Sequence, residues 1–264
     1  MIITRSPLRI SLGGGGTDLP SYYEKYGCNL TTMAINKYVY ICISDILKKN
    51  TIIKYSKTEN ILKINEIKHP IIRETIKYLN FDHSFKEIIT LADIPAGTGL
   101  GSSGAFNVAL MSAIKQKMNI KYTKFSNAED ACHIEINVLK EPSGKQDQFI
   151  SSYGGVQNLT ISKSGKTIMK KLKLSKSFEK KLIDNSLLIF TGYTRKSSKI
   201  LLEQKQKTIL NNYEMTKNLH EIKKFGYDIR KCLLDEDINK LGYLMDVHWK
   251  IKQNRSKKMS NHKI

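Results

Sequence analysis

The segment Pro95-Ala-Gly-Thr-Gly-Leu-Gly-Ser-Ser-Gly-Ala105 alternates glycine with other residues and then carries two serines. The apolar run 88–91 before it predicts a buried strand, and apolar residues at helical spacing after it predict a helix over 102–118. A glycine loop between a strand and a helix leaves N–H groups free at the positive end of the helix, where an anion binds. The segment therefore predicts a phosphate-binding loop, with a glycine-rich turn capped by serine as the alternative.

This loop differs from two common nucleotide-binding motifs. The Walker pattern requires a lysine directly after its last glycine, and this loop has none. The glycines at 99, 101 and 104 fit G-x-G-x-x-G, but they lie far from the N-terminus, and no second strand–helix–strand unit with an acidic ribose ligand follows. We therefore expect neither a Walker-type nucleotide site nor a dinucleotide-binding domain.

Length and composition predict a folded protein with one large domain or two smaller ones. The chain has 264 residues, 40% of them hydrophobic and 26% charged. No apolar run approaches the ~18 residues of a membrane span, and the N-terminal residues lack the apolar region of a signal peptide. The four cysteines have no C-x-x-C spacing, so we expect no disulfide, no zinc site and a cytoplasmic location.

The net charge of +20 is high enough to suggest nucleic-acid binding. The lysines and arginines are scattered, however, and the aromatic residues are not interleaved with them in an RNA-binding pattern. We therefore expect no nucleic-acid partner and no membrane partner. A positive field would still help to recruit a phosphorylated substrate.

Local patterns predict an α+β protein in two parts. Strands are expected at 2–12, 30–46, 51–56, 61–64, 88–91, 155–161, 167–172 and 186–191. Helices are expected at 70–80, at 102–118, from Ser126, which forms a capping box with Glu129, and over most of the last seventy or so residues. The change from strand-rich to helix-rich sequence predicts domains at 1–175 and 176–264.

Three more clusters carry side chains suited to chemistry. Asp147 is expected at a helix-to-strand junction, where nearby Lys145 would keep it ionised; a turn aspartate is the alternative. Glu135 falls on the apolar face of a helix, so it needs a basic partner or a metal ion. The segment 191–198 contains Arg195 and is either a capped helix start or a second anion site.

Two motifs resemble one known family. The pattern Pro-x-x-x-Gly-Leu-Gly-Ser-Ser-x-Ala is similar to the phosphate loop of the GHMP small-molecule kinases, named for galactose, homoserine, mevalonate and phosphomevalonate. The segment Pro7-Leu-Arg-Ile-Ser-Leu-Gly-Gly-Gly-Gly-Thr-Asp18 is similar to the first motif of the family's sugar kinases, with Arg9 before Asp18 at the same interval. Together with Gly-Lys-Gln-Asp-Gln at 144–148, these motifs are most similar to the bacterial heptose-phosphate branch.

The resemblance implies a two-domain fold, with a ribosomal-protein-like N-terminal domain and a ferredoxin-like C-terminal domain. It implies ATP-dependent phosphorylation of the anomeric hydroxyl of a sugar phosphate. Asp147 would receive or orient the proton of that hydroxyl, and Arg9 would stabilise charge in the transition state. Glu135 and Ser103 would bind Mg²⁺, with Ser102 as the alternate serine.

The same resemblance implies two further sets of binding residues. Those that would bind the nucleotide are Pro95, Gly97, Thr98, Gly99, Leu100, Gly101, Ser102 and Ser103. Those that would bind the sugar phosphate are Gly15, Gly16, Thr17, Asp18, Lys145 and Arg195.

The sequence departs from the family in two places. Gly15 and Gly16 stand where galactokinases carry Glu and His, which argues against galactose and leaves room for a bulkier substrate. Only Gly226 and Gly242 follow Gly192, so the family's third glycine-rich motif is missing and we expect an incomplete C-terminal domain. The alternatives are therefore a kinase for another sugar, such as fucose, or a nucleotide-binding module without turnover. A homodimer stays open.

Overall fold

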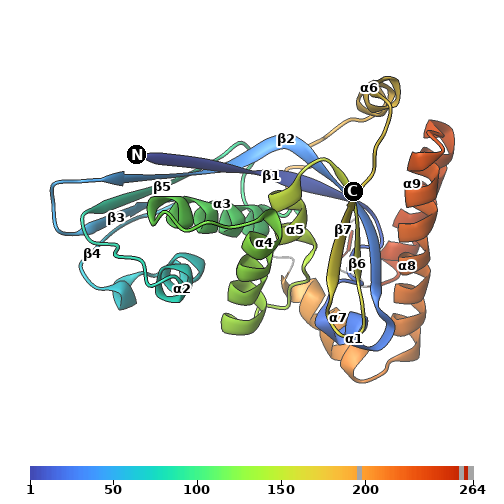
Figure 1. The fold of residues 1–264 in the computed structure, drawn as a ribbon. Helices are drawn as coiled ribbons and strands as arrows, with labels where there is room; N and C mark the ends of the chain where they lie inside the picture. Colours follow the sequence, from blue (N-terminus) through green and yellow to red (C-terminus); the bar gives the residue numbers. More distant parts are fainter. Residues whose placement is uncertain (195–197, 256–258, 261–264) are drawn as a thin grey trace. The chain divides into compact units, whose positions relative to one another are not determined.

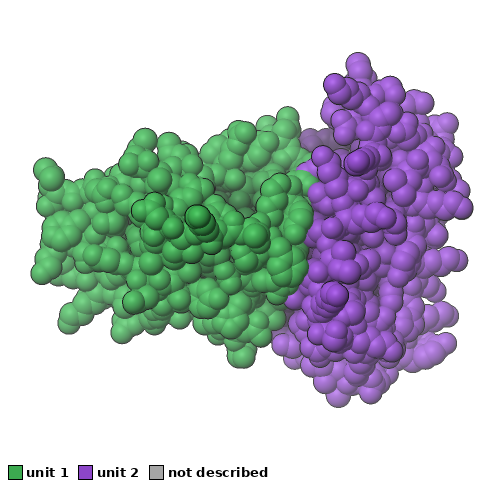
Figure 2. Space-filling model, viewed as in Figure 1, with its two compact units in different colours: residues 1–9, 34–141, 147–154 green, residues 10–33, 142–146, 155–264 purple. Residues whose placement is uncertain are grey.

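The computed structural model describes residues 1–194, 198–255 and 259–260 (Figure 1). The chain forms two compact units that interleave along the sequence, coloured separately in Figure 2. Unit 1 comprises residues 1–9, 34–141 and 147–154, and unit 2 comprises 10–33, 142–146 and 155–264. Strands and helices occur in both units, which confirms the α+β class. The division at 175/176 stays a prediction about folding domains.

Two long strands, β1 (Ile2–Gly13) and β2 (Cys28–Asp45), contribute residues to both units. In unit 1, β2 is followed in the sheet by β5 (Lys86–Ala92), β3 (Thr51–Lys54) and β4 (Thr58–Ile61). The β2–β5 pair is antiparallel with Ile43 opposite Ile88, and the β3–β5 pair is parallel with Ile53 opposite Ile88. These β-branched residues are fully buried, as expected where helices cover one face of a sheet.

The helices of unit 1 pack against this sheet, with α3 central among them (Figure 1). Their bounds are η1 Ile64–Glu66, α2 Pro70–Tyr78, α3 Ser102–Lys117, α4 Lys124–Cys132, the π-helical segment η2 His133–Val138, and α5 Gln146–Tyr153. Nearly every residue of α3 between Gly104 and Lys115 is buried. A helix that is apolar on all sides belongs in the interior, so the loop before α3 is held by the core of the unit.

Unit 2 combines strands of the seven-stranded sheet with long helices. Its elements are α1 Pro20–Tyr26, β6 Val156–Ile161, β7 Thr167–Lys171, α6 Lys176–Asp184, α7 Ser198–Ile209, α8 Tyr213–Leu234 and α9 Ile238–Gln253. The sheet order is β2, β6, β7, with Leu30 of β2 opposite Leu159 of β6. The helical character predicted for the last part of the chain is confirmed by α7, α8 and α9. No helix in the described residues is both long and apolar enough to cross a membrane.

Three of the predicted elements differ from the structure. The helix expected from Ser126 begins at Lys124, because Thr123 is its N-cap and Ser126 is the return partner of the capping box. The strand expected at 61–64 lies earlier, as β4, and the chain then bends into η1. Residues 186–191 form no strand, although all are described; β-prone residues need a neighbouring strand to pair with, and here Leu187 and Ile189 are exposed.

Candidate active site

The predicted phosphate loop connects β5 to α3 in unit 1. Gly97, Gly99 and Gly101 have φ of +82°, +80° and +77°, so the loop uses a backbone conformation that other residues rarely adopt. Gly101 is the N-cap of α3, and no side chain caps this helix start. Ser102 and Ser103 therefore occupy the first helical turn, and the alternative of a serine N-cap is wrong. The first-turn N–H groups form the kind of site that binds a phosphate.

The end of β1 in unit 1 brings Arg9 to this loop. The Arg9 amide donates to the Leu100 carbonyl at 3.0 Å, and its Nη1 donates to the Gly99 carbonyl at 2.7 Å. Its Nε and Nη2 both lie 2.7 Å from Oδ1 of Asp147, in the first turn of α5. The two residues predicted to be catalytic are thus in direct contact beside the start of α3.

Glycine at two positions makes this approach possible. A Cβ at Gly101 would lie 3.2 Å from both Arg9 Cγ and Asp147 Cγ. A Cβ at Gly104 would lie 2.6 Å from Asp147 Cβ, closer than real Cβ atoms come. The glycines of the motif therefore let the Asp147 backbone and side chain approach the first turn of α3.

Glu135 lies in η2, where the wider π-helical turn is often associated with function. Its side chain is buried, and its Oε2 accepts from the Ser103 hydroxyl at 3.0 Å. Its Oε1 accepts from the side-chain amides of Asn107 at 3.2 Å and Gln148 at 2.9 Å. Burial raises the pKa of Glu135, and the charge of Asp147 adds to this effect.

These contacts fit a cation better than a salt bridge. Ser103, Asn107 and Gln148 are all neutral, so they satisfy the oxygens of Glu135 without neutralising its charge. A buried carboxylate beside a hydroxyl, next to a phosphate-binding loop, is the oxygen donor set that Mg²⁺ uses together with nucleotide phosphates. Ser103 and Glu135, which the resemblance implies as Mg²⁺ ligands, are in contact in the structure, and their role in metal binding stays a proposal.

The glycine segment 13–16 and Asp18 lie in unit 2. Asp18 is buried, and its Oδ1 accepts from the Gly16 amide at 3.0 Å. Its Oδ2 accepts from the Gln146 amide at 2.9 Å, and this close approach requires the absence of a side chain at Gly144. The Thr17 hydroxyl donates to the Gly14 carbonyl at 2.7 Å, which tightens the turn. Hydrogen bonds within the loop and from Gln146 therefore hold the loop around the Asp18 carboxylate.

Two other predicted substrate residues have different outcomes. The ammonium group of Lys145 donates to the Thr167 hydroxyl at 3.2 Å. The Asp147 carboxylate, which we expected Lys145 to keep ionised, is paired with Arg9. Arg195 lies outside the described residues, so the second anion site at 191–198 stays a prediction.

Several residues of these sites were not predicted. Asn107 follows Ser103 by one helical turn, and this spacing could have indicated a shared face toward Glu135. Gln148 belongs to the quoted motif 144–148 and could have been expected beside the carboxylates. Gln204 of α7 and Arg255, which follows α9, contact the glycine segment from a distant part of the chain, and no local pattern indicates that contact.

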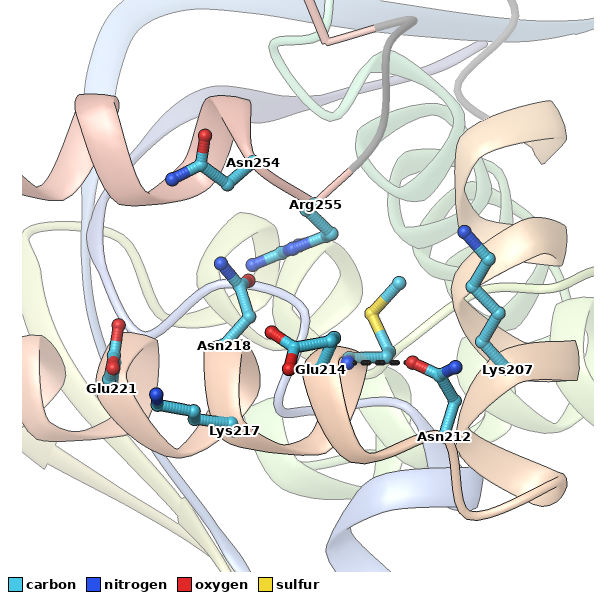
Figure 3. Close-up of a pocket in the computed structure, with 9 residues that line it drawn as sticks. Lys207, Asn212, Glu214, Lys217, Asn218, Glu221, Asn254 and Arg255 are labelled. Carbon is cyan, nitrogen blue, oxygen red and sulfur yellow. Dashed lines mark hydrogen bonds between the residues drawn. The ribbon is translucent and has the colours of Figure 1, made fainter.

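A polar cavity of about 270 Å³ lies among α7, α8 and α9 of unit 2 (Figure 3). Its lining includes Lys207 and Lys217, but also Glu214 and Glu221. Lys207 is in addition paired with Glu203 at 2.8 Å. The mixed charges give this cavity no strong preference for an anion.

Comparison with known proteins finds similarity to one kinase family. Residues 66–155, which contain the phosphate loop, Glu135 and Asp147, match the model of the GHMP kinases N terminal domain. This part of the chain is therefore similar to the N-terminal domain of the GHMP kinases. The chain is 26% identical over 276 residues to D-glycero-alpha-D-manno-heptose 7-phosphate kinase of Campylobacter jejuni, covering 100% of this chain and 80% of that protein.

Two further comparisons also find similarity to sugar kinases. The L-fucokinase/L-fucose-1-P guanylyltransferase of Bacteroides fragilis is 24% identical over 280 residues, which is 93% of this chain and 29% of that protein. The crystal structure of a D-glycero-D-manno-heptose 1-phosphate kinase from Bacteroides thetaiotaomicron has a TM-score of 0.81 at 23% identity, covering 96% of this chain and 79% of that one. The kinase is thus a phosphotransferase of the sugar-kinase type with the GHMP fold.

Proposed function

We propose that this kinase transfers the γ-phosphoryl group of ATP to the anomeric C1 hydroxyl of D-glycero-D-manno-heptose 7-phosphate. The product would be the 1,7-bisphosphate, used in nucleotide-activated heptose synthesis for capsule or lipopolysaccharide in the cytoplasm. The observation that carries the proposal is the contact of Arg9 with Asp147 at the start of α3. Two relatives whose names specify a heptose phosphate support the choice of sugar.

In this proposal Asp147 would accept the proton of the sugar hydroxyl. Both Arg9 contacts go to Oδ1, and none of the described residues donates a hydrogen bond to Oδ2. That oxygen can therefore take the hydroxyl proton as the C1 oxygen bonds to the γ-phosphorus. The bond from that phosphorus to the β,γ-bridging oxygen breaks, and ADP leaves. Positioning and electrostatics supply most of the rate enhancement in phosphoryl transfer, so a weak base suffices.

Arg9 has two roles in this proposal. It fixes the Asp147 carboxylate, and its charge lies beside the loop where the transferring phosphoryl group would bind. The loop residues 95–103 would hold the ATP phosphates with the N–H groups of the first turn of α3. Ser103 and Glu135 would hold Mg²⁺, which when bound neutralises charge on the phosphates.

In unit 2, the sugar phosphate would contact the glycine segment. The Asp18 carboxylate can accept hydrogen bonds from sugar hydroxyls, and Gly15, Gly16 and Thr17 would line the same surface. Lys145 and Arg195 are the basic residues proposed for the phosphate group of the sugar. The second candidate substrate is a fucose-like sugar, favoured by the match to the fucokinase. A nucleotide-binding module without turnover is the third reading.

A substrate panel tests the proposal. The purified chain is incubated with Mg-ATP and, separately, heptose 7-phosphate, fucose, galactose and mevalonate, and ADP and the phosphorylated product are followed by NMR. We expect turnover with heptose 7-phosphate and a product phosphorylated at C1. Turnover with fucose alone would replace the substrate. Absence of turnover with any sugar, together with an ATP-dependent rise in melting temperature, would favour the binding module.

A further inference from the structure

A buried arginine contacts the glycine segment 13–16 in unit 2. Arg255 follows the end of α9 and is 5% exposed. Figure 3 shows it where α7, α8 and α9 meet, beside the polar cavity. Burial lowers the pKa of Arg255 to about 10, while the charge of Asp18 acts in the opposite direction. A charge kept in such surroundings needs specific partners.

The partners of Arg255 lead directly to the glycine segment. Its Nη2 donates to the Gly15 carbonyl at 3.1 Å, and its Nη1 donates to Oε1 of Gln204 at 3.0 Å. Gln204, on α7, is fully buried, and its Nε2 donates to the Gly16 carbonyl at 2.7 Å. The Gly16 amide then donates to Asp18 Oδ1. A continuous chain of hydrogen bonds therefore runs from α9 through α7 and the loop to Asp18.

The loop has the backbone that this arrangement needs. Gly16 has φ of +98°, and a Cβ there would lie 2.5 Å from Arg255 Nη1 and 3.0 Å from Gln204 Oε1. Glycine at this position thus serves two purposes, a left-handed turn and the close approach of a guanidinium group. A side chain at position 16 would therefore disturb both the bend of the loop and its packing against Gln204 and Arg255.

We propose that Gln204 and Arg255 are positioning residues, which fix the glycine segment 13–16 and thereby hold the Asp18 carboxylate in the orientation that binds substrate. The role of Asp18 in this inference rests on the proposed function. The contacts of Gln204 and Arg255 with the loop are independent of it. The inference assigns a role in the sugar site to α7 and to the turn after α9, which lie outside the three motifs that resemble the family. Neither residue touches the substrate in this scheme.

The substitution Gln204→Glu tests the link with little change in volume. A carboxylate still accepts from Arg255, but it places an oxygen in place of the N–H that donates to the Gly16 carbonyl. We expect amide hydrogen exchange in residues 13–18 to become at least about tenfold faster, with exchange in β5 unchanged. With an active sugar substrate, KM for the sugar should rise about tenfold or more, while KM for ATP stays constant.

Thr208→Val is the matched control. Thr208 lies one turn further along α7, is buried, and donates only to the Gln204 carbonyl of its own helix. It should change the melting temperature without changing exchange in residues 13–18. If Gln204→Glu fails to fold, Arg255→Lys provides the same measurement, because lysine cannot reach both Gly15 and Gln204.

The outcomes separate this inference from the proposed function. Unchanged exchange in 13–18 in a folded Gln204→Glu or Arg255→Lys variant overturns the positioning role, whatever the substrate is. Equal acceleration in Thr208→Val also overturns it, because the effect would then be general loosening of α7. Faster exchange confined to the loop supports the role, even if the substrate panel finds no turnover and the proposed reaction fails.

Discussion

The guanidinium group of Arg9 contacts a single carboxylate oxygen of Asp147, with Nε and Nη2 both 2.7 Å from Oδ1. The arginine lies within the strand β1, and the aspartate lies in the first turn of the helix α5, 138 residues later. Their side chains are 15% and 26% exposed, so the pair is only partly shielded from water. This geometry fixes one carboxylate oxygen, and none of the described residues donates a hydrogen bond to the other.

Asp147→Asn should abolish most turnover and keep nucleotide binding. The amide preserves the shape of the side chain but cannot accept the hydroxyl proton, and such assistance is typically worth about 10² to 10⁴ in rate. ATP affinity should persist, because the loop 97–103 is unchanged. The measurement is kcat together with the melting temperature on one preparation.

Asp246→Asn is the control for the loss of an ion pair. Asp246 pairs with Lys250 on the exposed face of α9, where such a pair contributes little stability. It should leave kcat unchanged. An Asp147→Asn enzyme within about threefold of the parent rate would remove Asp147 from the mechanism, since that is less than ~1 kcal/mol of barrier.

Gly104→Ala should reduce both stability and rate. The added Cβ meets Asp147 Cβ at 2.6 Å and the Asp147 carbonyl carbon at 3.0 Å, so α3 and α5 must move apart. Overpacking of this kind typically costs about 1–3 kcal/mol. Because the clash is with the proposed base, kcat should fall even at temperatures where the variant is fully folded.

Gly242→Ala is the matched helical glycine. It lies in α9 with nothing within 4 Å of an added Cβ, so helix propensity alone should stabilise the protein by up to about 1 kcal/mol. Denaturant unfolding of both variants measures the difference. Equal effects of the two substitutions would contradict a special role for Gly104.

The resemblance to the GHMP kinases implied a shared role for Arg9 and Asp147 and another for Ser103 and Glu135, and the structure brings each pair into contact. The strand, glycine loop and helix around 95–105 follow from alternating glycines and apolar spacing, which are local signals. The helix that begins at Lys124 shows the limit of such signals. Thr123 and Ser126 can both serve as N-cap, and the local sequence does not decide between them.

Other features depend on contacts between distant parts of the chain. Residues 186–191 have strand composition, yet strand formation depends on a pairing partner that the segment itself cannot supply. Gln204 and Arg255 reach the glycine segment only because α7 and α9 pack behind it. No pattern within either helix distinguishes these two residues from the many other polar residues nearby.

His248 should make the protein less stable in acid. Burial lowers the pKa of His248 from 6.5 to about 3, and the charges of Lys252 and Arg255 act in the same direction. Below about pH 6.5 the unfolded chain takes up a proton that the folded protein refuses until about pH 3. The free energy of unfolding should therefore fall across this range, by at most a few kcal/mol from this group.

The substitution His248→Phe checks this sign. Phenylalanine keeps the ring beside Phe225 but does not titrate. Urea unfolding at several pH values between 7 and 4 should show a shallower loss of stability for the variant. A slope identical to that of the parent would assign the acid sensitivity to other groups.

Glu135 should have the opposite pH dependence in the metal-free protein. Burial raises its pKa above the ordinary value of 4.5, so the folded state holds a proton that the unfolded chain releases. The stability contributed by this group is fully present below about pH 4.5 and is lost as the pH rises through the folded pKa. Metal-free Glu135→Gln, which cannot ionise, should therefore be more stable than the parent at pH 8.

Mg²⁺ with a non-hydrolysable ATP analogue should reverse that order. The metal requires the ionised carboxylate, so its stabilising effect on the parent should grow with pH and be absent in Glu135→Gln. Glu59→Gln is the control. Glu59 is also buried, but hydrogen bonds from the Lys68 amide and the Tyr55 hydroxyl lower its pKa. Replacing Glu59 should therefore destabilise the protein at pH 8. Melting curves with and without Mg²⁺ measure each effect, and a Mg²⁺ response in Glu135→Gln equal to that of the parent would exclude Glu135 as a metal ligand.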